Sequence, residues 1–126
     1  MWPFFIEENQ PVLTYYSQKV FSIRYLLEIA MIEEKILAMV GKYIAELEGI
    51  NIPVKRMDTS RKARDLSLNE RLMHAHYLCK NVQKFIRDPE SRDKGIMHFG
   101  FMQACLSFGG LYSIDDFRKV SPLRPE

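Results

Sequence analysis

Residues 20–32 read VFSIRYLLEIAMI and lie at the centre of a segment, Tyr15 to Glu48, that contains no proline. Every residue of the central stretch other than Ser22, Arg24 and Glu28 is apolar or aromatic. A helix on the surface of a globular protein carries one apolar stripe, whereas a helix that is apolar on all sides has to be covered on all sides. The stretch therefore predicts a long, central first helix that is buried in the fold, in an oligomer interface, or in both.

Local signals mark both ends of this helix. Pro11 suits a first helical turn, because the N–H that proline lacks would be unpaired there in any residue. Glycine commonly follows the last turn of a helix, and Gly49 is placed for that role. We therefore predict that the helix begins between Pro11 and Thr14 and stops at Gly49.

The chain has 126 residues, of which 47% are hydrophobic and 27% charged, as in an ordinary globular protein. This length predicts one domain, residues 1–126. The N-terminus lacks the basic segment of a signal peptide, and Arg24 and Glu28 interrupt the apolar run well before the roughly 20 residues that a membrane span needs. Cys79 and Cys105 have no metal-binding or disulfide spacing. These features predict a cytoplasmic protein with two reduced, buried thiols and no membrane partner.

Residues 1–13 form an apolar arm in front of the helix, with aromatic side chains at Trp2, Phe4 and Phe5. Exposed apolar clusters usually mark contact surfaces. We expect the arm to pack on the first helix of its own chain or on a second subunit. The predicted interface consists of Trp2, Phe4, Phe5, Val20, Ile23 and Leu27.

A second helix is predicted from Leu68 to Arg87. Ser67 and Glu70 have the spacing of a capping box, in which each side chain pairs with a backbone N–H of the first turn. Pro89 ends the helix, because the residue before a proline is pushed out of the helical region. The apolar face has the three- and four-residue spacing of a helix and comprises Leu68, Leu72, Ala75, Cys79, Val82 and Ile86.

Two further helices are predicted after this one. Ile96 to Phe108 contains no charged residue and should be as buried as the first helix, ending at Gly109-Gly110. A strand over Ile96 to Met102 is the alternative. Ser113 and Asp116 resemble a second capping box and predict a short helix to Val120, followed by a tail, residues 121–126.

These elements predict an all-α fold, a four-helix bundle-like single domain with a long central first helix. Two highly apolar helices in so small a bundle leave more apolar surface than one chain readily covers. We therefore expect a homodimer.

The sequence has no strong pattern for catalysis or metal binding. Glu70 and His74 are four residues apart, whereas the Glu-x-x-His motif of di-iron bundles has a spacing of three. A catalytic zinc site needs three protein ligands. No serine is framed by glycines as in a nucleophile elbow, and Gly109-Gly110 lacks the Lys-Ser/Thr of a phosphate-binding loop. The sequence favours a protein without metal, cofactor or enzymatic activity.

Positive charge is concentrated in the middle of the chain. Residues 55–94 contain eleven Lys/Arg against six Asp/Glu, whereas residues 1–54 contain four against seven. Many of these cations lie in the predicted connector, residues 50–66, where phosphates of a nucleic acid would be neutralised. The connector lacks the aromatic residues that stack on single-stranded bases. A solvated loop and a binding site for an acidic protein are therefore alternatives to a nucleic-acid site. The candidate nucleic-acid-binding residues are Lys55, Arg56, Arg61, Lys62 and Arg64.

Residues 92–98 read RDKGIMH, which resembles the Arg-polar-x(3–5)-His motif of HEPN domains. Leu66 to Phe108 also resembles the helical arrangement of mannitol operon repressor-like proteins. HEPN domains are small α-helical bundles, often dimeric, and many are metal-independent ribonucleases. The resemblance implies that Arg92 and His98 act on the 2′-hydroxyl and phosphate of RNA, with Asp93 as the supporting polar residue. A two-fold axis would bring both copies of this motif into one cleft.

Three functional hypotheses follow. The leading one is a small cytoplasmic helical protein that works by oligomerisation or by binding a protein partner, without catalysis. The second is a HEPN-like ribonuclease or RNA-binding module. The third is an accessory protein that binds nucleic acid through residues 55–64.

Overall fold

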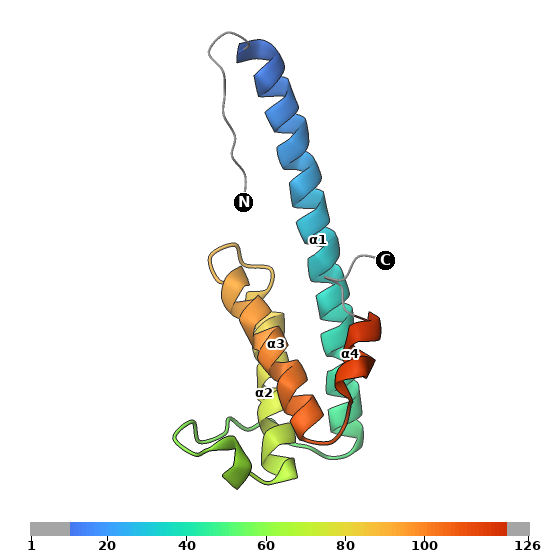
Figure 1. Ribbon diagram of the computed structural model, residues 1–126, viewed down its shortest axis with the longest axis vertical. Coiled ribbons are helices and arrows are strands. Elements are labelled where there is room, and N and C mark those ends of the chain that lie inside the picture. The colour runs from blue at the N-terminus through green and yellow to red at the C-terminus, as the bar shows by residue number, and fades with distance from the viewer. Residues whose placement is uncertain (1–10, 121–126) are drawn as a thin grey trace. The chain divides into compact units, whose positions relative to one another are not determined.

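The structure is a computed structural model that describes residues 11–120, with side chains described from Ser22 onward. This part of the chain is helical and contains no strand, which confirms the all-α prediction (Figure 1). None of its helices is long and apolar enough to cross a membrane. The α-helices are α1 (Pro11–Gly49), α2 (Leu68–Phe85), α3 (Arg92–Phe108) and α4 (Ile114–Val120), and a 3₁₀ turn, η1, covers Ala63–Asp65.

The chain divides into two compact units, Met1–Ile32 and Glu33–Glu126, and α1 runs through the boundary between them. The first unit contributes the beginning of α1. The second contains the rest of α1 and the other three helices that the structure describes. The predicted arm residues Trp2, Phe4 and Phe5 lie outside the described residues.

The predicted bounds of α1 are confirmed, but the left-handed residue that follows the helix is Asn51 and not Gly49. Gly49 is still helical, and the left-handed residue is Asn51, with φ of 62°. The Asn51 N–H donates to the Glu48 carbonyl at 3.0 Å, and the Ile52 N–H donates to the Leu47 carbonyl at 2.9 Å. This pair of bonds is a Schellman motif, and asparagine is the residue type that most often replaces glycine there.

Both predicted capping boxes are confirmed. In α2 the Ser67 Oγ accepts the Glu70 N–H at 3.1 Å, and Glu70 Oε1 accepts the Ser67 N–H at 3.2 Å. At α4, Ser113 and Asp116 make the same reciprocal pair at 3.1 and 2.9 Å. Each box pairs backbone N–H groups that a helix start otherwise leaves unpaired, so these starts are determined locally.

The core of the second unit is built by one face of each helix. The second half of α1 supplies buried residues at the spacing of a helical stripe, and α2 supplies its predicted face except for Leu68, which is 57% exposed. The buried side chains are Ile36, Val40, Tyr43, Ile44 and Leu47 from α1; Leu72, Ala75, Leu78, Cys79 and Val82 from α2; Phe99, Met102 and Leu106 from α3; and Ile52, Leu66, Ile86 and Phe117.

The prediction that α3 is as buried as an all-round apolar helix is wrong. The helix begins at Arg92, four residues earlier than expected, and the strand alternative is also wrong. Only one side of α3 is buried, and Met97, Phe101 and Phe108 are exposed on another side. Apolar composition overstated burial here, because one face of α3 is enough to pack against α2.

In the described part of the chain, the side chains of α1 from Ser22 to Met31 are largely exposed, so burial of residues 20–32 by the N-terminal arm or by a second subunit stays a prediction. From Ser22 to Met31 every residue except Ile29 is exposed. The buried residues of α1 begin at Ile36.

Helices α2 and α3 form an antiparallel hairpin joined by the turn at residues 86–91 (Figure 1). Gly95, which is buried in the first turns of α3, allows their backbones to approach closely. A Cβ at Gly95 would lie 3.0 Å from the Ile86 nitrogen and 3.1 Å from its Cα. Because these are backbone atoms, they cannot move aside as a flexible side chain would.

We predict that Gly95→Ala destabilises the protein by about 1–3 kcal/mol, because the new methyl group must push α3 away from Ile86. Gly100→Ala in the same helix is the matched control, since no atom lies within 4 Å of the added Cβ. Replacing that exposed helical glycine should stabilise the protein by roughly 0.5–1 kcal/mol. Urea unfolding of both variants measures the difference, and a Gly95→Ala protein as stable as Gly100→Ala would contradict the close-approach argument.

Candidate functional site

Arg92 is the first residue of α3, and its side chain is held by α1. The Arg92 Nε donates to Glu33 Oε1 at 2.6 Å, and the two side chains are only 27% and 14% exposed. Glu33 precedes the buried stripe of Ile36 and Val40 by three and seven residues, so it lies on the same face of α1. The positive charge of Arg92 is therefore used within the fold.

A second ion pair joins the same two regions. Glu34 Oε1 accepts a hydrogen bond from the Arg87 guanidinium. Arg87 lies in the turn between α2 and α3 and Arg92 directly follows it, so consecutive glutamates of α1 hold this turn near both of its ends. Asp93, the predicted supporting residue, is exposed in the first turn of α3, where a negative charge stabilises the helix dipole.

His98 lies elsewhere. Its ring is 5.9 Å from the Phe85 ring, edge to face, and it lines a cavity to which Arg92 does not contribute. Burial and the neighbouring Lys94 lower the pKa of His98. The structure thus does not bring Arg92 and His98 together in one site within a single copy of the chain.

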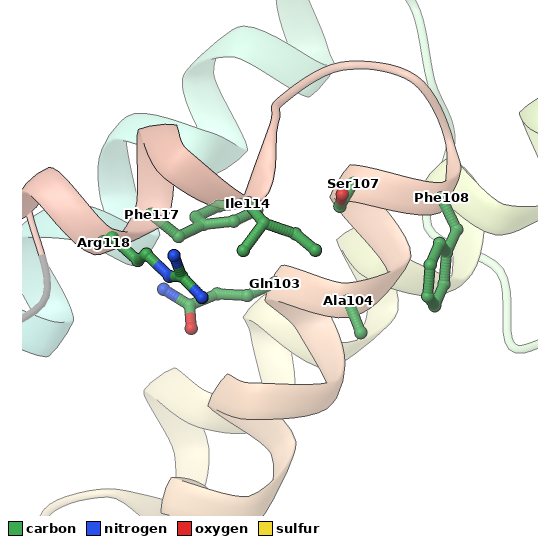
Figure 2. Close-up of a pocket in the computed structure, with 7 residues that line it drawn as sticks. All are labelled: Gln103, Ala104, Ser107, Phe108, Ile114, Phe117 and Arg118. Carbon is green, nitrogen blue, oxygen red and sulfur yellow. The ribbon is translucent and has the colours of Figure 1, made fainter.

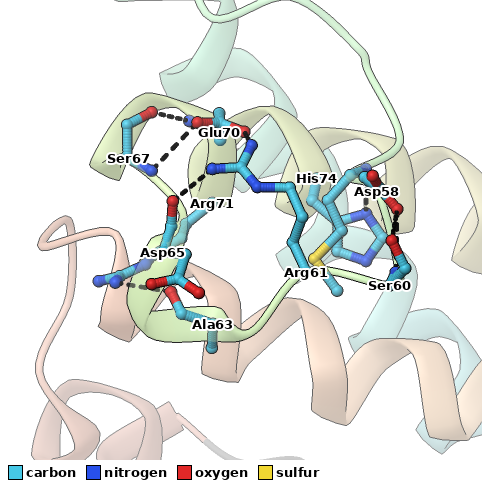
Figure 3. A network of polar contacts seen from close by, with 10 residues as sticks. Asp58, Ser60, Arg61, Ala63, Asp65, Ser67, Glu70, Arg71 and His74 are labelled. Atoms are coloured by element: carbon cyan, nitrogen blue, oxygen red, sulfur yellow. Dashed lines mark hydrogen bonds and ion pairs between the residues drawn. The ribbon is translucent and has the colours of Figure 1, made fainter.

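The basic connector is folded back on α2 rather than extended into solvent (Figure 3). Arg61 pairs with Glu70 at 2.7 Å and also donates to the Asp65 carbonyl. Arg71 of α2 donates to the Ala63 carbonyl at 2.9 Å and to the Phe108 carbonyl at 2.9 Å. Arg71 therefore ties the connector and the end of α3 to α2, a role that no local pattern in the sequence indicated.

The five predicted nucleic-acid-binding cations consequently have different environments. Arg61 is paired, and Arg64 lies 3.9 Å from Asp65 with both side chains well exposed. Lys55 and Lys62 are exposed. Arg56 lines the cavity that contains His98. Lys55, Arg56 and Arg61 line one pocket together with the carboxylates of Asp58 and Glu70, and Lys62 and Arg64 do not line it.

Two histidines of α2 hold the connector in place by different means. The Nδ1 atom of His74 accepts the Met57 N–H at 3.2 Å, so the hydrogen of the neutral ring is on Nε2. The buried His76 uses Nδ1 as a donor to the Ile52 carbonyl at 2.7 Å. The two rings therefore have opposite tautomers, and each tautomer is fixed by a backbone partner more than ten residues away.

The cavity lined by His98 has a volume of about 530 Å³ and lies between the connector, α2 and α3. His74 and His98 both line it. The His74 ring stacks on Tyr77 with centroids 5.6 Å apart and planes at 22°. Burial, followed by the charges of Arg56 and His98, lowers the pKa of His74. Two neutral histidines and an aromatic wall therefore form one side of a space that basic residues also line.

The thiols and carboxylates provide no reactive centre in the described residues. Burial raises the pKa of the Cys79 thiol to about 12 and also raises that of Cys105, so neither forms a thiolate nucleophile near neutral pH. Both cysteines are free, as predicted, and Cys79 is buried whereas Cys105 is only partly so. Within residues 22–120 no group of three His, Cys, Asp or Glu side chains could hold a metal ion.

Apolar surface remains exposed in both units. A pocket of about 320 Å³ lies between the end of α3 and α4, where Ile114 and Phe117 face Gln103 and Ala104 (Figure 2). In the first unit, the predicted interface residues Ile23 and Leu27 are 52% and 61% exposed. The side chain of Val20 lies outside the described residues.

No family model matches the chain, and no curated protein or solved structure matches it significantly.

We predict that stability falls as the pH drops below about 6.5, because the pKa values of His74 and His98 are lowered in the folded protein. The unfolded chain then binds more protons than the folded one. Stability is thus complete above the ordinary histidine pKa of 6.5 and is lost as the pH falls toward the lower, folded values. Urea unfolding above and below pH 6.5 measures this, and His74→Gln/His98→Gln should flatten the dependence. An unchanged slope in that variant would refute the assignment.

We also predict measurable energetic coupling between Glu33 and Arg92. A double-mutant cycle with Glu33→Ala and Arg92→Ala should give about 1–2 kcal/mol, because this hydrogen-bonded pair is largely removed from solvent. The exposed pair Glu48 and Lys80, with atoms 3.9 Å apart, is the control and should give about 0.5 kcal/mol or less. Equal coupling in the two pairs would show that burial does not strengthen the Glu33 contact.

Proposed function

We propose that this protein is a non-catalytic helical interaction protein that self-associates through residues 22–31 of α1. The observation that carries the proposal is the exposure of this segment, in which Leu26, Leu27 and Met31 are each about 60% exposed. Burial of apolar surface contributes roughly 25 cal/mol per Å² of favourable free energy, so a complex in which a partner covers these side chains is stabilised. The free thiols of Cys79 and Cys105 support a reducing, cytoplasmic setting.

A second copy of the same helix fits this segment by spacing. Ile23, Leu27 and Ala30 recur at intervals of four and three residues, the heptad spacing by which two helices pack side by side. Leu26 and Met31 flank this stripe and are exposed as well. A paired helix would therefore cover the stripe and part of its margins.

Charge supports an antiparallel pair. Arg24 and Glu28 stand at equal distances before and after Leu26 in the sequence. In an antiparallel pair centred on Leu26, Arg24 of each copy faces Glu28 of the other, which is the self-complementary arrangement of a two-fold interface. A parallel, in-register pair does not bring Arg24 opposite Glu28 in this way.

The other two hypotheses have less support. The guanidinium of Arg92 is engaged by Glu33, and the cavity that contains His98 does not include Arg92. In the connector, Arg61 is engaged by Glu70. Neither the ribonuclease motif nor the residues 55–64 therefore offer a ready set of groups for nucleic acid.

Sedimentation velocity tests the proposal. We expect the wild-type protein to sediment as a dimer and the Leu26→Gln/Leu27→Gln variant to shift toward the monomer. Glutamine keeps a high helix propensity, so the helix itself should persist. Leu68→Gln is the matched control, because Leu68 is a comparably exposed helical leucine outside α1 and should leave the dimer intact. A monomeric wild-type protein at all concentrations would overturn self-association.

Charge substitutions test the orientation. Arg24→Glu and Glu28→Arg should each weaken the dimer when present alone, because each creates like-charge contacts in an antiparallel pair. Mixing the two variants should restore association, since the two chains then carry opposite charges at these positions. Single variants that associate as strongly as the wild type would contradict the antiparallel arrangement.

A further inference from the structure

The cavity between the connector, α2 and α3 is lined by residues that have no part in the proposed self-association. Its volume of about 530 Å³ falls within the range of roughly 300–1,000 Å³ common for small-molecule sites. Arg56, Lys84 and Lys94 line it, and no aspartate or glutamate does. The lining therefore carries three positive charges with no negative charge to balance them.

These cations are not engaged in ion pairs. None of the salt bridges of residues 22–120 includes Arg56, Lys84 or Lys94. Most other cations of the connector and of the hairpin turn, such as Arg61, Arg87 and Arg92, are paired with carboxylates. Three cations without an ion pair thus line one cavity, whereas others, such as Lys42 and Lys62, are exposed elsewhere on the surface.

One aromatic ring brings two of the cations together. The Nζ atom of Lys94 lies 4.6 Å from the centroid of the Phe85 ring, and the Nζ atom of Lys84 lies 5.4 Å from the same centroid. The ring face attracts each ammonium group. Two like charges held near one ring repel each other, and a bound dianion would remove that repulsion.

A buried polar atom of the cavity wall lacks a partner. The Nδ1 atom of His98 is buried and makes no hydrogen bond, whereas the Nδ1 atom of His74 is occupied by the Met57 N–H. Because this Nδ1 atom is buried, other atoms of the His98 ring form the surface that lines the cavity. His98 also contacts Phe85, so its ring is next to the one that holds both lysines.

Much of the remaining wall is apolar or aromatic, and Thr59 and Asn81 add polar groups to it. Met57, Tyr77, Met97 and Phe101 line it, and Phe101 is 59% exposed. Apolar walls with a few convergent polar groups are typical of sites for organic ligands rather than for inorganic ions alone. An exposed aromatic ring also offers a stacking surface for a flat ring.

We propose that this cavity binds a small organic phosphate, with its phosphate between Lys84, Lys94 and Arg56 and a flat apolar body against Phe101. The site lies within the unit Glu33–Glu126, so the proposal does not depend on self-association through residues 22–31.

Isothermal titration calorimetry with phenyl phosphate tests the proposal on the full chain. We expect saturable binding by the wild-type protein and an affinity lowered about tenfold or more in Lys84→Gln/Lys94→Gln, because charge-assisted contacts are lost. Lys42→Gln/Lys119→Gln makes the same change in net charge at exposed lysines outside the cavity and should leave the affinity unchanged. All four lysines are exposed, so folding should be preserved in both variants.

Three further probes separate the parts of the proposal. Glycerol phosphate, which has no ring, should bind more weakly than phenyl phosphate, and Phe101→Leu should abolish the difference between them. Benzoate, a monoanion with a ring, should also bind more weakly. No saturable binding of phenyl phosphate, or an equal loss in the two lysine variants, would overturn the site. If benzoate bound as tightly as phenyl phosphate, the assignment of a phosphate group would be wrong. If glycerol phosphate bound as tightly as phenyl phosphate, the contact between a flat ring and Phe101 would be wrong.

Discussion

The close approach of α3 to the end of α2 at Gly95 is the constraint on which the second unit depends. Without a side chain at Gly95, the first turns of α3 reach the backbone of Ile86. The same approach places Lys94 and His98 beside Phe85, so it forms the cavity wall as well as the core. Packing of this kind tolerates little added volume, because protein interiors are as dense as organic crystals.

The cations of residues 55–94 include some that pair with carboxylates of the fold and some that line the cavity of the proposed ligand. The glutamates of α1 neutralise Arg87 and Arg92 near both ends of the turn between α2 and α3, and Glu70 neutralises Arg61 of the connector. These contacts hold the elements in register. The basic excess of residues 55–94 is thereby reduced to a few cations, and no carboxylate lines the cavity to which three of them belong. Net charge along the sequence could not distinguish these two uses.

Apolar composition was a good guide to helices and a poor guide to burial. The run at residues 20–32 and the run from Ile96 to Phe108 are both helical, but each exposes large apolar side chains. In the first case the exposed side chains belong to the unit Met1–Ile32 and not to the core of the second unit. In the second, α3 needs only one face for packing against α2. Surface of this kind is where a second chain can bind, which is why α1 carries the proposal of self-association.

The sequence alone determined the starts of α2 and α4, because these depend on hydrogen bonds between residues a few positions apart, whereas α3 begins four residues before the predicted Ile96. The capping boxes at Ser67 and Ser113 are examples, although the stop of α1 at Asn51 was assigned to Gly49. Only the tertiary structure decided that Arg92 pairs with Glu33, 59 residues away, and that His98 faces another site. Such contacts depend on how helices pack, and neither spacing nor composition records which distant side chain will be opposite.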